Sequence, residues 1–158
     1  ERFIEEILAA EELFIIGVGR VFLALQAMGK RLAHLGIPIE VVGFVTEKAI
    51  TEKDVLLVAS GSGESVVPMT IAKIAKKYNA KLGLITSSQT STIKSMADFV
   101  VHLPCPTKTN GAYGVQSVQP MSTLFDQSLH IVLDSISVQL SQRLGKGREE
   151  MLKKHTNI

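Results

Sequence analysis

The sequence has little of what marks secreted, membrane-bound or nucleic-acid-binding proteins. Its 158 residues include no tryptophan and a single cysteine, Cys105, so no internal disulfide can form. Nothing resembles a secretion signal, and no stretch approaches the roughly 18 apolar residues of a membrane-spanning helix. Seventeen Lys and Arg residues are balanced by fifteen Asp and Glu residues, which favours neither nucleic acid nor a membrane surface as a partner. We therefore expect a soluble, cytoplasmic protein.

Length and hydrophobic content bound the architecture. A chain of 158 residues suits one domain spanning residues 1–158. Hydrophobic residues make up 46% of it, which favours a sheet buried on both faces or buried subunit interfaces. Because the sequence begins at Glu1 without a methionine, we expect that an upstream helix is missing from it.

Five short, almost continuously apolar segments alternate with helical patterns. The predicted strands are residues 12–17, 37–43, 54–60, 80–86 and 98–104. The predicted helices are residues 22–36, 66–78, 91–97 and 121–144, whereas the connection 44–53 is less clearly helical. This alternation predicts an α/β fold, a three-layer α/β/α sandwich around a five-stranded parallel sheet in flavodoxin-like order. Ligands then bind beyond the carboxyl ends of the strands.

The loop after the third strand, SGSGES (residues 60–65, the serine loop), carries the strongest functional signal. Pro68 is tolerated only in the first turn of a helix, so a helix begins near Ser65 or Val66. A glycine-containing turn at a helix N-terminus binds anions. A lone serine there would be a simple N-cap, but three hydroxyls favour phosphate binding.

The neighbouring residues narrow the kind of phosphate compound. A P-loop requires lysine after its last glycine, and here Glu64 follows Gly63, which argues against a nucleoside triphosphate. The loop after the first strand, GVGRVF, has Phe22 where a dinucleotide-binding loop has its third glycine. A nicotinamide or flavin cofactor is therefore not expected, and a small monophosphate fits better.

Together, GVGR (residues 17–20) and SGSGES resemble the sugar isomerase (SIS) domain family. The resemblance implies that Ser60, Ser62 and Ser65 bind the phosphate of a phosphosugar, assisted by the Gly61 amide. Residues 30–36, 110–129 and 154–158 narrow the resemblance to the 6-phospho-3-hexuloisomerases. That subfamily interconverts 3-hexulose 6-phosphate and fructose 6-phosphate through a cis-enediol, without a cofactor or metal.

Two residues depart from the subfamily pattern, which has serine at the position of Val21 and glutamate at the position of Asp126. Both changes lie near the expected chemistry and away from the phosphate. Three functions therefore stay open: the hexulose isomerase, another SIS aldose–ketose isomerase such as one for pentose 5-phosphates, and a non-catalytic phosphosugar-sensing module.

Three residues are catalytic candidates. Asp126 matches the family's base, although an acid in a first helical turn also complements the helix dipole, which lowers its pKa. His34 could shuttle protons, but it is also a cation beside the C-cap glycine of its helix. His155, in the matching tail, could reach the site of a neighbouring subunit.

The remaining candidates are binding residues. Gly19, Arg20, Ser87 and Gln119 are expected to contact the sugar. Residues 105–120 form a long aperiodic loop in which Thr107, Asn110 and Tyr113 are further possible contacts. His102 and His130 are expected to be structural, and the apolar excess and the family favour a homo-oligomer, a tetramer.

Overall fold

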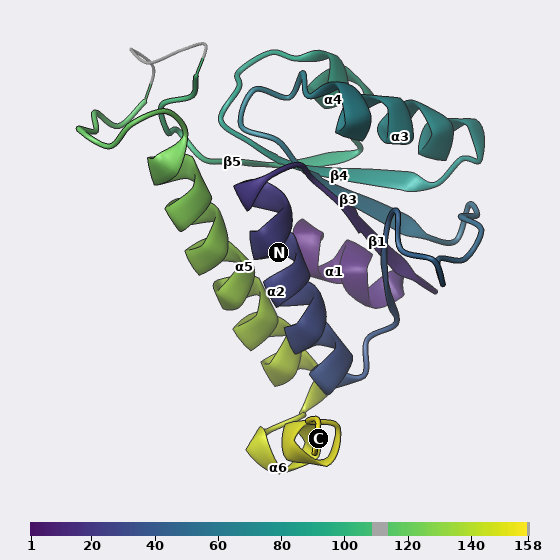
Figure 1. The fold of residues 1–158 in the computed structure, drawn as a ribbon. Helices are drawn as coiled ribbons and strands as arrows, with labels where there is room; N and C mark the ends of the chain where they lie inside the picture. Colours follow the sequence, from purple (N-terminus) through teal and green to yellow (C-terminus); the bar gives the residue numbers. More distant parts are fainter. Residues whose placement is uncertain (109–113, 158) are drawn as a thin grey trace.

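The computed structural model describes residues 1–108 and 114–157, and its centre is an all-parallel sheet with helices on both faces (Figure 1). The strands are β1 (Leu13–Ile16), β2 (Ile39–Val41), β3 (Val55–Ala59), β4 (Lys81–Thr86) and β5 (Phe99–His102). Their order is β2-β1-β3-β4-β5, with every neighbouring pair parallel. The predicted flavodoxin-like order and three-layer architecture are confirmed.

Two separate cores explain why the strands are apolar throughout. Ile15, Leu57 and Ala59 point to the face covered by α1 (Arg2–Ala9), α2 (Arg20–Leu35) and α5 (Thr123–Leu144). The alternating neighbours, including Phe14 and Leu56, point to the face covered by α3 (Val66–Lys77) and α4 (Thr92–Met96). Because successive side chains of a strand point to opposite faces, each strand needs apolar residues at every position.

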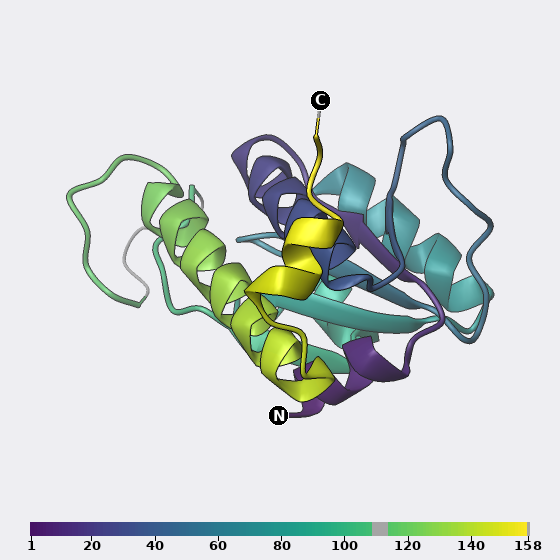
Figure 2. The same cartoon turned by 90° about the horizontal axis from the view of Figure 1, so that it is seen from below.

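The connection between β2 and β3 contains no helix. It leaves the sheet through a turn in which Gly43 has a φ of +91° and its N–H donates to the Glu47 carboxylate at 2.6 Å. Two helices lie outside the predicted pattern. One is α1, whose Phe3, Ile4 and Ile7 are buried, and the other is α6 (Arg148–Lys153), which contacts α2 (Figure 2).

Helix α2 runs from the carboxyl ends of the strands back to their amino ends. It begins beside the carboxyl end of β1, after Gly19, and ends at Gly36, which has a left-handed φ of +74°. The N–H groups of Gly36 and Ile37 donate to Ala33 and Leu32, which closes the helix in the manner of a Schellman motif. Residues at the end of α2 therefore lie at the amino edge of the sheet.

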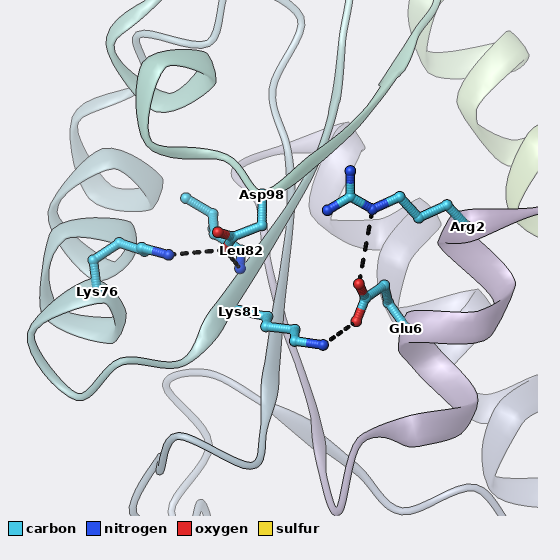
Figure 3. Close-up of polar contacts among 6 residues, drawn as sticks. All are labelled: Arg2, Glu6, Lys76, Lys81, Leu82 and Asp98. Atoms are coloured by element: carbon cyan, nitrogen blue, oxygen red, sulfur yellow. Dashed lines mark hydrogen bonds and ion pairs between the residues drawn. The ribbon is translucent and has the colours of Figure 1, made fainter.

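Ion pairs fasten the outer elements to the sheet (Figure 3). Glu6 on α1 accepts from Lys81 at the start of β4 and pairs with Arg2. Asp98, just before β5, accepts from the backbone N–H of Leu82 at 2.7 Å and from Lys76 at 2.8 Å. Within residues 1–108 and 114–157, no helix combines the length and the hydropathy needed to cross a membrane.

Candidate functional site

The serine loop is tied to the end of β4. The N–H of Ser60 donates to the Ile85 carbonyl at 3.0 Å, and the Gly61 carbonyl accepts from the N–H of Ser87 at 3.1 Å. The Thr86 hydroxyl donates to the same carbonyl at 3.2 Å. The loop is therefore held at the carboxyl edge of the sheet, where the sequence predicts a ligand site.

The backbone of the loop orients its hydroxyl groups. The N–H of Gly63 donates to Ser60 Oγ at 3.1 Å, and the N–H of Glu64 donates to Ser62 Oγ at 3.2 Å. A hydroxyl that accepts a hydrogen bond in this way keeps its own proton for another partner. Ser60 and Ser62 are thus prepared to donate to an anion.

Ser65 occupies the N-cap position of α3, but its side chain does not cap the helix. Its Oγ lies 3.1 Å from Ser60 Oγ instead, so the Ser65 hydroxyl is part of the cluster of serine hydroxyls in the loop. As predicted, α3 begins at Val66 and places Pro68 in its first turn. The first amides of α3 have no carbonyl one turn earlier, and the helix dipole favours a negative charge there.

Two adjoining cavities lie beside the serine loop. All four predicted phosphate-binding residues, Ser60, Gly61, Ser62 and Ser65, line the smaller cavity of about 190 Å³. The larger one, of about 540 Å³, is lined by residues that include Gly19, Arg20, Thr123 and Asp126. The two cavities share Val18, Val21, Lys108 and Ser122. An anion held by the serine loop would therefore extend the rest of its molecule toward Arg20 and Asp126.

Asp126 lies in the first turn of α5 with only 9% of its side chain exposed. Its Oδ2 is 3.4 Å from Arg20 Nε, whereas Oδ1 is buried and has no hydrogen-bond partner in the part of the chain that the structure describes. Burial raises the pKa of Asp126, although the charges of Arg20 and Lys108 oppose the shift. The pKa of Asp126 is therefore shifted in the direction opposite to that expected of an acid which only complements the helix dipole.

His34 and His155 lie together but away from Asp126. Their ring centroids are 5.0 Å apart, and His34 is 7% exposed near the end of α2. The pKa of His34 is lowered by burial and by the nearby charges of His155, Lys30 and Arg31. His34 lies fourteen positions after Arg20 in the same helix, about 21 Å along the axis. Within one chain, the structure does not bring this histidine pair to the cavities.

Ser87 and Gln119 do not line either cavity. Ser87 is 1% exposed and supports the serine loop through its N–H, while its carbonyl lies 3.1 Å from His102 Nε2. Gln119 donates from Nε2 to the Gln127 side chain at 3.1 Å. Gly19 and Arg20 do line the larger cavity, and Thr107 lines the smaller one. Asn110 and Tyr113 lie outside the described residues.

Several residues that line the two cavities were not singled out by the sequence pattern. Lys108 lines both cavities, Ser122 does the same from the start of α5, and Phe125 closes the smaller cavity. Thr123 accepts from Arg20 at 3.4 Å. The one available signal was the length of the 105–120 loop, which marks the segment as functional without showing which side chains face the ligand.

A hydroxyl-rich loop at a helix N-terminus, at the carboxyl edge of a parallel sheet in this order, is typical of an anion-binding α/β protein. The SIS domain family matches residues 6–131, and the chain belongs to this family. The predicted family resemblance is therefore confirmed.

Several relatives carry the name 3-hexulose-6-phosphate isomerase. The one from Mycobacterium gastri is 33% identical over 153 residues, covering 97% of this chain and 76% of that protein. The one from Bacillus subtilis is 29% identical over 160 residues, covering 100% of this chain and 85% of that protein. A solved Methanococcus jannaschii structure, described as inferring a 3-hexulose-6-phosphate isomerase function, matches with a TM-score of 0.88. Its identity is 29%, over 99% of this chain and 84% of that one.

Proposed function

We propose that this protein is an isomerase that interconverts 3-hexulose 6-phosphate and fructose 6-phosphate through a cis-enediol. The observation that carries the proposal is the pair of adjoining cavities, one lined by serine hydroxyls and the other by a buried carboxylate beside an arginine. The names of the relatives support the same reaction.

The smaller cavity is the proposed phosphate anchor. Ser60, Ser62 and Ser65 donate to the phosphate oxygens, and each hydrogen bond to a charged group contributes about 1.5–3 kcal/mol. The anchor does no chemistry itself, but its binding energy fixes the sugar so that the reacting carbons lie in the larger cavity.

The proton transfers belong to the larger cavity. The Asp126 carboxylate, which lines the larger cavity, takes the proton from C2, and the electron pair left behind forms the C2–C3 double bond, with negative charge on O3. The C2 hydroxyl proton passes to O3, and Asp126 returns its proton to C3, which leaves the carbonyl at C2. A base with a raised pKa serves this exchange well, and Arg20 and Lys108 stabilise the enediolate oxygens.

We also propose that the chain forms a homo-oligomer, a tetramer whose sites lie near the subunit boundaries. The histidine pair and several exposed apolar side chains would then belong to the subunit interfaces. Large apolar side chains are exposed on the elements that carry the site: Met121 lines the larger cavity, Val66 begins α3 after the serine loop, and Leu23 lies in the first turn of α2. A second copy of the chain would cover them. In such an assembly His34 and His155 would serve the site of a neighbouring subunit.

The test is an isomerisation assay with a panel of hexulose and pentose phosphates. Asp126→Asn should lower kcat by about a hundredfold or more, because a positioned base contributes that much. Ser62→Ala should mainly raise KM. Asp134→Asn is the matched control, since Asp134 is exposed on the same helix and pairs with His130 at 3.8 Å.

Other outcomes of these assays would indicate a different base, a different substrate or a non-catalytic function. Undiminished turnover in Asp126→Asn would contradict its role as the base. Turnover of a pentose phosphate alone would favour the other aldose–ketose isomerase. Binding without turnover, lost in Ser62→Ala, would identify a sensing module.

A further inference from the structure

Glu64 places a carboxylate in the loop that we propose binds a phosphate. A carboxylate beside a phosphate repels it, and at short range in a partly buried site that repulsion is substantial. Yet Glu64 lines neither cavity. Its side chain must therefore have another role within the serine loop.

The carboxylate of Glu64 binds the start of α4. Its Oε1 accepts from the backbone N–H of Thr92, the first residue of α4, at 2.6 Å. The next amide of the helix, that of Ile93, donates to the Gly63 carbonyl at 3.3 Å. Two successive amides of α4 thus bind two successive residues of the serine loop. The negative charge of the Glu64 carboxylate therefore faces α4 and not the cavities.

Gly63 shows how closely these segments approach. Its φ is +67°, and a Cβ added to it would lie 2.1 Å from Ser91 Oγ and 2.6 Å from Ser91 Cβ. Ser91 is itself fixed, because its Oγ accepts from the N–H of Lys94 as the N-cap of α4. A side chain at position 63 would force the loop and α4 apart.

The same two loop residues orient the phosphate-binding hydroxyls. The Gly63 N–H binds Ser60 Oγ, and the Glu64 N–H binds Ser62 Oγ. Any rotation of the Gly63–Glu64 backbone would turn both donors away from these hydroxyls. The contact with α4 prevents that rotation.

We infer that Glu64 is a positioning residue, whose carboxylate anchors the serine loop to α4 and thereby directs the Ser60 and Ser62 hydroxyls at the phosphate. This inference rests on the proposed function of the serine loop. It separates two roles within SGSGES: the serines contact the ligand, and the acid contacts only the protein. A glutamine preserves the accepting oxygen, whereas an alanine removes it.

The experiment measures the Kd for inorganic phosphate, together with KM and kcat for the phosphosugar, in the full chain. Glu64→Ala should raise Kd and KM about tenfold and change kcat by less than about twofold, as loss of one charge-assisted hydrogen bond implies. Glu64→Gln should stay within about threefold of the wild-type Kd, because a neutral acceptor bonds less strongly. Glu52→Ala, on an exposed residue at the amino edge of the sheet, is the control.

Amide hydrogen exchange supplies a readout that does not depend on phosphate. The Thr92 amide should exchange faster in Glu64→Ala than in Glu64→Gln and the wild type. An unchanged or tighter phosphate Kd in Glu64→Ala would overturn the inference, as would a glutamine variant that behaves like the alanine variant. If the wild type binds no phosphate or phosphosugar, the proposed function fails, and the inference falls with it; if the wild type binds and Glu64→Ala binds equally, only the inference fails.

Discussion

The pKa of Asp126 depends on opposing influences from a few neighbouring residues. Burial raises this pKa, while Arg20 and Lys108 lower it again through their charges. The desolvation of the carboxylate and the two nearby cations therefore act on this pKa in opposite directions. Asp126, which is shorter by one methylene than the subfamily's glutamate, lies with Oδ2 3.4 Å from Arg20 Nε, and this ion pair holds its carboxylate at the larger cavity.

Replacing Lys108 with methionine should alter the pH profile of kcat/KM. The Lys108 charge lowers the pKa of Asp126, so its loss should raise that pKa further. Because the base acts in its deprotonated form, activity falls as the pH falls through this pKa, and the acid limb should move to higher pH. We expect about a tenfold lower kcat/KM at neutral pH.

Lys77→Met, at the end of α3, is the control for this change. A lower kcat/KM with an unmoved acid limb would contradict the electrostatic link between Lys108 and Asp126.

Among the secondary-structure elements, those with strong local patterns were predictable. The strands and α3 follow from apolar runs and from Pro68, which sets the start of α3 at Val66. The β2–β3 connection was less certain for a physical reason: a turn at Gly43 replaces the helix that the alternating pattern would suggest. The short helix α1 has a clear apolar stripe, but at eight residues it depends on packing against α5 and β5.

Asp98, which connects the start of β5 to α3 and β4, provides a test of fold stability. Burial alone would raise its pKa, but hydrogen bonds from Lys76 and the Leu82 N–H lower it overall. A carboxyl whose pKa is lowered in the folded state stabilises the fold above its ordinary pKa of 3.8, and that stability is lost as the pH falls through the lowered value. Asp98→Ala should therefore cost about 1–2 kcal/mol at neutral pH and less in acid.

Urea unfolding at several pH values measures this difference. Asp134→Ala, which removes an exposed pair with His130, should cost no more than about 0.5 kcal/mol at neutral pH. A deficit for Asp98→Ala that does not shrink in acid would show that lost packing, and not the charged hydrogen bonds, carries the effect.

For the whole molecule, the candidate site is predictable where its residues are contiguous. Ser60, Gly61, Ser62 and Ser65 lie in one short turn, so local sequence places them on one cavity. Ser87 was placed at the correct edge, but a strand end does not reveal which way its side chain points. Lys108 lies in an aperiodic loop, and the contact of His155 with His34 depends on the tail folding back, so neither follows from a local pattern.

Subunit complementation tests the assignment of the histidine pair. If His155 serves a neighbouring site, Asp126→Asn and His155→Ala chains should each be impaired as pure proteins. Mixed and reassembled in equal amounts, they should recover up to about one quarter of wild-type activity, since that share of sites has both native residues. Each variant refolded alone is the control, and a mixture no more active than the average of the two would contradict the shared site.

The span of α2 has a consequence for how its sequence can change. Its first residue, Arg20, faces the cavities, and His34 packs in the histidine pair near the opposite edge of the sheet. Each residue of a helix advances the rotation by about 100°, so a single deletion inside α2 would turn His34 out of its buried contact while leaving Arg20 in place. Point substitutions on the exposed face are tolerable, but insertions and deletions are not, and α2 should keep a constant length.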